Sequence, residues 1–206
     1  MHDIVEHHQA CTAQRTRAYA ELFGGQPAKI FSPHDLFPQP DEHFLIDIFV
    51  YQMETALRVI EVAVTNGMSD QRMEAPEHEI EWPRRELIQY FPQCTAGHAR
   101  RLHDMAWLPL FDGFYLDSHH TIGWEHPAVP DTPWKNAFFL RPLVNDHRDY
   151  SFEVEGDPVS FLWHIPISDA ERAYKQKHGS EGLIDRLEAV QLPWVFDEQD
   201  RPSLLE

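Results

Sequence analysis

The sequence of 206 residues predicts a single α+β domain spanning residues 1–206, with a mostly antiparallel mixed sheet flanked by helices. Three observations lead to this prediction. Residues 44–51 and 56–65 are rich in β-branched and aromatic side chains, and the short link between them favours an antiparallel hairpin. Residues 4–22 and 96–110 show helical periodicity. The 16 prolines argue against a helical bundle, because each removes a backbone donor.

The N-terminal helix is expected at about residues 3–23, and Gly24-Gly25 would end it in a left-handed cap. One face of this helix is only weakly apolar, so we expect the helix to pack at the periphery. That face consists of Ile4, His8, Cys11, Arg15, Tyr19 and Leu22. Residues 30–40, rich in proline and aromatic side chains, are expected to be a connector.

Apolar residues on both faces of the hairpin strands predict a central position in the sheet. Residues 62–73 include a β-branched run that leads into Asn66-Gly67, a dipeptide that favours a turn because both residues tolerate positive φ. Pro109 is expected to close the helix that begins at Ala96. Residues 116–133 are rich in turn formers, and further strands are expected at residues 86–91, 138–140, 152–154 and 159–167.

A Ser168-Asp169-Ala170-Glu171 capping box predicts a helix that breaks near Gly179 and resumes over residues 180–190. The pair Arg84-Arg85 is interpreted as ion-paired or solvated rather than as a nucleic-acid contact. His164, on an apolar strand, is interpreted as a hydrogen-bonded core histidine.

Charge is the second strong feature of the chain. There are 17 basic and 34 acidic residues, a formal net charge of −17. Such a surface repels nucleic acid and anionic membranes and attracts a basic partner, although the charge can also serve solubility alone. Two cysteines, Cys11 and Cys94, are too few for a zinc site built from thiolates and are expected to be reduced. The N-terminus lacks the apolar segment of a signal peptide, so a cytoplasmic location is expected.

Several short segments follow one another along the chain in a characteristic order. The segments are residues 62–68, 85–90, 108–110, 120–122, 161–171, 194–197 and 201–203. Together they resemble the suppressor of fused family over about residues 35–205. No single segment is specific, but the ordered set is. At one position the chain departs from the pattern, because His119 replaces a glycine before His120-Thr121-Ile122.

The resemblance implies a compact α+β fold and a role in binding proteins. The animal namesake binds a zinc-finger transcription factor of the hedgehog pathway. Bacterial single-domain members are associated with polymorphic toxin loci, where they look like immunity proteins. We therefore expect a cytoplasmic, non-enzymatic module that needs no cofactor and binds a protein partner, such as a basic toxin. No nucleic-acid or membrane partner is expected, and the oligomeric state stays open.

No catalytic residue is assigned. The alternative function is a metal-dependent hydrolase built on the polar residues 117–126. Imidazoles and carboxylates are suitable zinc ligands, but the spacing here matches no known metal motif, and a chain with 14 histidines produces such clusters by chance. A polar surface loop is the competing interpretation. The candidate ligands are Asp117, His119, His120 and His126.

Aromatic and acidic residues of the same region form a candidate partner-binding surface, because tyrosine and tryptophan often anchor interfaces. They could line a groove or flank a sheet edge that accepts a partner strand. Core packing is the alternative explanation for the aromatic residues. The candidates are Tyr115, Asp117, Trp124, Glu125 and Trp134.

Overall fold

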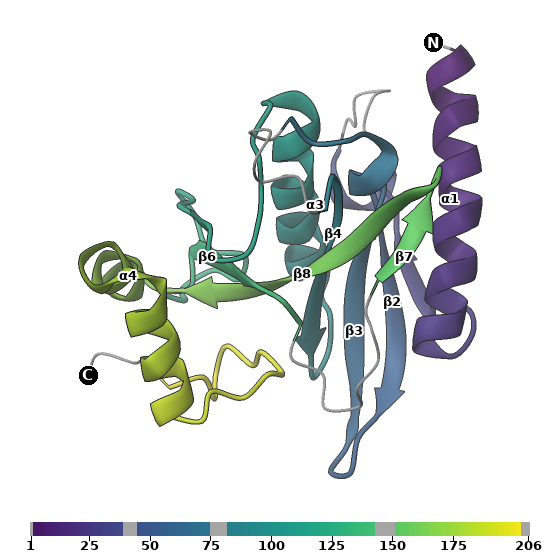
Figure 1. The fold of residues 1–206 in the computed structure, drawn as a ribbon. Coiled ribbons are helices and arrows are strands. Elements are labelled where there is room, and N and C mark those ends of the chain that lie inside the picture. Colours follow the sequence, from purple (N-terminus) through teal and green to yellow (C-terminus); the bar gives the residue numbers. More distant parts are fainter. Residues whose placement is uncertain (1, 39–44, 75–81, 143–150, 203–206) are drawn as a thin grey trace.

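A sheet of eight strands forms the centre of the molecule (Figure 1). The structure is a computed structural model that describes residues 2–38, 45–74, 82–142 and 151–202. In chain order the strands are β1 (Lys29–Phe31), β2 (Asp47–Glu54), β3 (Val59–Asn66), β4 (Arg84–Phe91), β5 (Thr121–Ile122), β6 (Asn136–Leu140), β7 (Ser151–Val154) and β8 (Asp157–Ile167). The helices are α1 (His2–Phe23), α2 (Pro33–Leu36), the 3-10 helix η1 (Met68–Asp70), α3 (Ala96–Phe111) and α4 (Asp169–Ala189).

Strand pairing follows the order β1-β2-β3-β4-β8-β6-β5, and β7 pairs with β8 beside this path. The pairs are antiparallel except for β4 and β8, which run parallel. The predicted fold class, an α+β domain with a mostly antiparallel mixed sheet flanked by helices, is confirmed. Within the described ranges, none of the helices combines the length and apolar character of a membrane-spanning segment.

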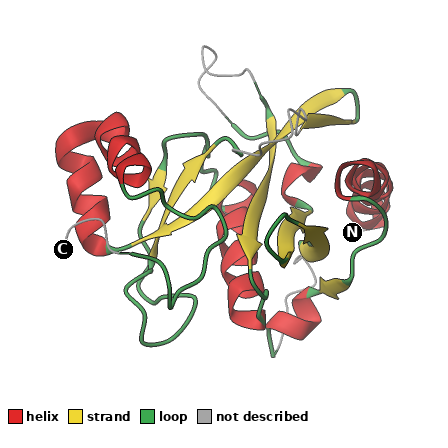
Figure 2. Cartoon of the chain, turned by 90° about the horizontal axis from the view of Figure 1, so that it is seen from below, coloured by secondary structure: helices red, strands yellow, loops and turns green. Residues whose placement is uncertain are grey.

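Helices cover both faces of the sheet (Figures 1 and 2). Successive side chains of a strand point to opposite faces, so Ile48 and Val50 pack with α3 on one side. Phe49 and Tyr51 point to the other side and contact Tyr19 of α1, in a cluster that also includes Leu183 and Leu187 of α4. The central strands are therefore buried on both faces, as the sequence predicts.

The predicted hairpin is formed by β2 and β3, paired from Asp47 opposite Asn66 to Glu54 opposite Val59. Residues 56–58, predicted as strand, belong to the turn. Thr55 closes this turn because its hydroxyl donates to the carbonyl of Arg58 at 2.7 Å and accepts from the amide of Arg58 at 3.1 Å. Phe44, the predicted start of the first strand, lies outside the described residues.

Two short elements lie in the predicted connector. β1 pairs with β2, and Asp35 caps α2 by accepting from the amide of Ser32 at 2.8 Å. α3 continues to Phe111 although Pro109 lies inside it, and it ends where the amide of Asp112 donates to Leu108 at 3.0 Å. A proline so close to the C-terminal end disrupts little of the helix.

α4 follows the sequence prediction. Ser168 and Glu171 form the capping box, and Gly179 interrupts the helix with a φ of 78°. His164 lies in the core, with Nδ1 2.6 Å from Oε1 of Gln89. The predicted capping box, helix break and core histidine are therefore all confirmed.

The face predicted for α1 is correct for the described side chains from His8 to Leu22, but the predicted peripheral packing is wrong. Cys11, Arg15 and Tyr19 are completely shielded from solvent. The hydroxyl of Tyr19 donates to the carbonyl of Thr65 at 2.8 Å. Arg15 can be buried because carboxylates neutralise it, and a count of apolar residues does not detect this compensation.

Those carboxylates belong to the Arg15 cluster, which consists of Arg15, Asn66, Ser69, Asp70 and Glu86. Arg15 donates to Asn66 at 2.6 Å and to Asp70 at 2.5 Å. Glu86 accepts from the amide of Ser69 at 2.9 Å and from its hydroxyl at 2.6 Å. The cluster ties α1 to β4 and to the turn after β3, so the polar residues of the 62–73 segment have a structural role here.

Gly67 allows this turn to form. Its φ is 144°, and a Cβ built at this position would lie 2.6 Å from the carbonyl oxygen of Leu45. Asn66 remains in β3, so only the glycine uses the positive φ that the dipeptide predicts.

Candidate partner-binding loop and pocket

Residues 123–135 form a loop that lies against the first turns of α3. Thr95 caps this helix, since its hydroxyl accepts from the amide of His98 at 3.3 Å. Gly97 lets the loop approach closely: a Cβ there would lie 2.8 Å from the carbonyl oxygen of Ala128. The sequence at the start of α3 therefore fixes where the loop lies.

Arg101 of α3 binds the loop of residues 123–135 through hydrogen bonds and a ring contact. Its guanidinium donates to the carbonyl of His126 and, at 3.4 Å, to that of Lys135. It also lies over the ring of Trp124, 5.1 Å from the ring centroid. Burial lowers the pKa of Arg101 to about 10, so the side chain still carries its charge at neutral pH.

A pocket lies between this loop, α3, β8 and the C-terminal residues. Its walls include the side chains of Gln89, His98, Arg101, Trp134, His164 and Glu198. Burial lowers the pKa of His164 to about 3 and lowers that of His98, which lies 3.5 Å from the carboxylate of Glu198. The imidazole and amide groups of the walls, which can accept or donate hydrogen bonds, thus lie beside the guanidinium of Arg101 and the carboxyl group of Glu198.

Trp134, a predicted partner-binding residue, is 6% exposed. Its indole N–H donates to the carbonyl of Glu198 at 3.4 Å. The guanidinium of Arg201 lies 4.0 Å from its ring centroid, and Arg201 is in turn paired with the buried Glu171 at 3.2 Å. Trp134 therefore joins the loop to the C-terminal segment.

Tyr115 and Asp117, also predicted to bind a partner, lie next to each other. The tyrosine hydroxyl donates to the carboxylate at 2.6 Å, and Arg85 of β4 donates to the second oxygen. Burial is the main cause that raises the pKa of Tyr115 to about 12, and the hydrogen bond to Asp117 is the next largest cause. The carboxylate of Asp117 is therefore already engaged by protein groups.

The four candidate metal ligands have different surroundings. Asp117 is held by Arg85 and Tyr115, and Nδ1 of His120 lies 3.1 Å from the carbonyl of Tyr115. His119 has a φ of 70°, and the side chain of His126 is 80% exposed. Among the described residues, the three-ligand group of this protein contains none of the four; it consists of His7, Cys11 and Glu155.

Glu125 is the most exposed of the predicted partner-binding residues, with 87% of its side chain accessible. Trp124 is half-buried beside Arg101. The loop therefore exposes an acidic side chain to solvent, while its two tryptophans pack inward and fix the position of the loop.

The sequence interpretation missed two exposed phenylalanines near the end of α3. Phe111, at the end of α3, is 45% exposed, and Phe114, just beyond it, is 55% exposed. Trp107 stacks on Phe111 with centroids 4.5 Å apart. The signal that could have revealed the pair is a helix end marked by Gly113 between two phenylalanines.

Comparison with known proteins identifies the family to which this chain belongs. The family described as Suppressor of fused protein (SUFU) matches residues 45–199. The chain belongs to the suppressor of fused family, as the ordered segments predict.

Particular relatives share the whole fold. A suppressor of fused homologue from Neisseria gonorrhoeae FA 1090 has a TM-score of 0.65 at 14% identity, and the match covers 98% of both chains. A chain of the Sufu–Fu complex has a TM-score of 0.66 at 12% identity, with 95% of this chain and 91% of that chain covered. Drosophila Suppressor of Fused has a TM-score of 0.65 at 13% identity; 95% of this chain is covered, but only 50% of the Drosophila chain.

One relative is similar in sequence over a shorter stretch. Immunity protein YqcF of Bacillus subtilis (strain 168) is 33% identical over 67 residues. The match covers 32% of this chain and 34% of YqcF, so it spans about a third of each protein.

Proposed function

We propose that this chain is a non-enzymatic, cytoplasmic protein-binding module that acts as an immunity-type inhibitor of a basic partner, such as a toxin. Membership of the suppressor of fused family is the observation that carries the proposal. One structural relative was solved in complex with Fu, and the relative from Bacillus subtilis is named an immunity protein.

The net charge of −17 supports a basic partner. Opposite charges steer two proteins together and raise the association rate most at low ionic strength. Binding to such a partner should therefore weaken as salt increases, because exposed charges are screened beyond a Debye length of about 8 Å at physiological ionic strength.

Within this proposal, the loop of residues 123–135 forms part of the binding face. Gly97 and Arg101 hold the loop in one arrangement, and a preorganised loop loses less conformational entropy on binding. Glu125 supplies an exposed negative charge for a basic partner. Trp124 and Trp134 support the loop, while Tyr115 and Asp117 fix the chain that leads into it.

The experiment is an affinity capture from native lysate at low salt, with the tagged chain as bait and elution at high salt. We expect a basic protein in a stoichiometric amount, whose toxicity on expression is relieved by coexpression of this chain. An empty bait at low salt, or a captured protein whose toxicity is unchanged, would contradict the inhibitor proposal.

Two charge-reversed baits test the binding face. Glu125→Lys and Glu54→Lys change the net charge equally, and both residues are exposed, but Glu54 lies at the β2–β3 hairpin. We expect Glu125→Lys to weaken binding by at least about 10-fold and Glu54→Lys to have a much smaller effect. Equal losses would assign the effect to net charge and exclude the loop as the binding face.

A further inference from the structure

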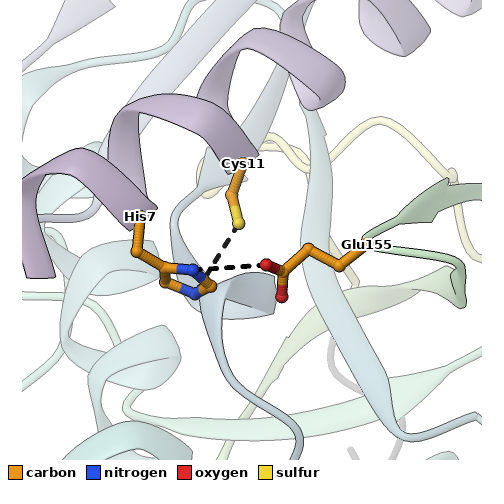
Figure 3. Close-up of side chains that lie close together, drawn as sticks. All are labelled: His7, Cys11 and Glu155. Carbon is orange, nitrogen blue, oxygen red and sulfur yellow. Dashed lines mark hydrogen bonds and ion pairs between the residues drawn. The ribbon is translucent and has the colours of Figure 1, made fainter. Parts of the chain in front are cut away.

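Three potential metal ligands meet where α1 passes the turn between β7 and β8. His7 and Cys11 are four residues apart, so they lie on one face of α1, and Glu155 comes from the turn. Figure 3 shows the three side chains pointing toward one another. One ligand atom from each residue lies within 4.8 Å of the other two.

The separations suit a tetrahedral cation. Oε1 of Glu155 lies 3.3 Å from Nδ1 of His7, and Sγ of Cys11 lies 3.7 Å from Nε2, the other nitrogen of that ring. Nε2 also lies 2.9 Å from the carbonyl oxygen of Asp70, so Nδ1 is the nitrogen available to an ion. Two ligands on one tetrahedral zinc ion lie about 3.5 Å apart, given bonds of about 2.3 Å to sulfur and about 2.0 Å to nitrogen. Small side-chain rotations would therefore direct all three donors at one ion.

The donor set favours zinc. Thiolate, imidazole and carboxylate are the three side-chain groups that bind Zn²⁺ in proteins, and a soft thiolate disfavours Mg²⁺ and Ca²⁺. Cys11 is fully buried, while the side chains of His7 and Glu155 are 40% and 38% exposed. An ion could thus enter from solvent and reach the buried sulfur.

Neighbouring groups orient the ligands. Arg84 donates to Oε2 of Glu155 at 2.8 Å, which leaves Oε1 facing His7. The amide of Glu155 donates to the side-chain carbonyl of Gln14 at 2.9 Å, which fixes the turn. Such outer partners typically contribute about 10- to 100-fold to metal affinity.

We propose that His7, Cys11 and Glu155 form a zinc-binding site, with water as the fourth ligand. Zinc would replace the proton of the Cys11 thiol, which passes to solvent. The bound ion would clamp α1 to the β7–β8 turn. His7 and Cys11 lie outside residues 45–199, so the family match does not assign this site.

The test uses reduced protein without a tag, titrated with CoCl₂ and then with ZnCl₂. A chain with 14 histidines can bind cations elsewhere, so stoichiometry alone does not identify the site. A cobalt–thiolate charge-transfer band does, because it requires sulfur bound to the ion. We expect this band together with the strong visible absorption of tetrahedral Co²⁺, and we expect Zn²⁺ to abolish both.

Cys11→Ser should remove the thiolate band and weaken zinc binding at least about 10-fold. Cys94→Ser is the matched control, because Cys94 is the other free, buried cysteine and should leave the band unchanged. Circular dichroism checks folding. If Cys11→Ser does not fold, Glu155→Gln, a near-isosteric change of a partly exposed residue, should weaken zinc binding. Absence of the band in the natural chain, or full zinc affinity in Cys11→Ser or Glu155→Gln, would overturn the proposal.

Discussion

The guanidinium of Arg15 in α1 donates to the carboxylate of Asp70 in η1 at 2.5 Å, in a site where Arg15 has no solvent exposure. Glu86, also fully buried, lies 3.7 Å from the same guanidinium. One cation therefore neutralises two carboxylates that come from distant parts of the sequence.

Replacing Arg15 by methionine should destabilise the fold strongly. The change leaves Asp70 and Glu86 without their cation, and breaking a buried pair in this way costs about 3–5 kcal/mol. Urea unfolding measures the loss. Arg17→Met is the control, because Arg17 is exposed on the same helix and should change stability by less than about 0.5 kcal/mol. Similar losses in the two variants would show that the pairing is not what stabilises α1.

Gly67→Ala should destabilise more than Gly24→Ala. Both glycines have positive φ, which is strained for alanine, but only at Gly67 would the new Cβ clash, 2.6 Å from the carbonyl of Leu45. We expect a loss of about 1–2 kcal/mol at Gly24 from backbone strain alone and a clearly larger loss at Gly67. Thermal unfolding of both variants checks the order, and a larger effect at Gly24 would refute the steric explanation.

His119→Gly should stabilise the protein. His119 holds a φ of 70°, at the position where the family resemblance leads us to expect glycine, and its backbone contacts to Phe139 (2.7 Å) and Lys175 (2.7 Å) do not need the side chain. Relief of the strain should raise stability by about 0.5–1 kcal/mol, after the greater freedom of glycine in the unfolded chain is subtracted. His119→Asn should fall between the two. A lower melting temperature for the glycine variant would contradict this account.

His164 should make the fold sensitive to acid. Burial lowers its pKa from 6.5 in the unfolded chain to about 3. The unfolded state therefore binds an extra proton between these values, so the stabilisation is complete above pH 6.5 and is lost as the pH falls towards 3. The slope contributed by one such group approaches about 1.4 kcal/mol per pH unit.

Urea unfolding at several pH values tests this slope. His164→Gln lowers stability at neutral pH but removes the titrating group, so its stability should fall less steeply between pH 6 and pH 4, an interval within the about 3 to 6.5 window of His164. Parallel pH profiles for the natural chain and the variant would show that His164 does not carry the effect.

Local signals in the sequence predict most elements of this fold. The hairpin, the capping box at Ser168 and the break at Gly179 follow from propensity and spacing within a few residues. The structure starts β4 at Arg84, two residues before the predicted strand, because Arg84 and Arg85 pair with Val159 and Ser160 of β8. Their side chains form ion pairs with Asp157 and Asp117. The ion-paired interpretation of the two arginines is thus confirmed, but their strand conformation depends on distant partners.

Contacts between distant residues explain what the sequence could not reveal. The burial of α1 depends on the pairing of Arg15 with Asp70, and β1 is a strand because β2 provides its partner. The meeting of His7, Cys11 and Glu155 requires the β7–β8 turn to lie beside α1, which spacing along the chain does not indicate. Three of the residues predicted to bind a partner, Trp124, Glu125 and Trp134, lie in the loop of residues 123–135, and their role in binding stays a prediction.

The Arg15 cluster also sets a lower limit on the size of the folding unit. A fragment cut to residues 45–199, the stretch by which the family is recognised, would keep Asp70 and Glu86 but lose the only helix that supplies Arg15. The fragment would lose the cation that pairs with these two carboxylates, and it would lose the packing of Tyr19 on Phe49 and Phe161. The stretch that identifies the family is therefore shorter than the stretch that we expect to fold on its own. The latter includes the first 23 residues.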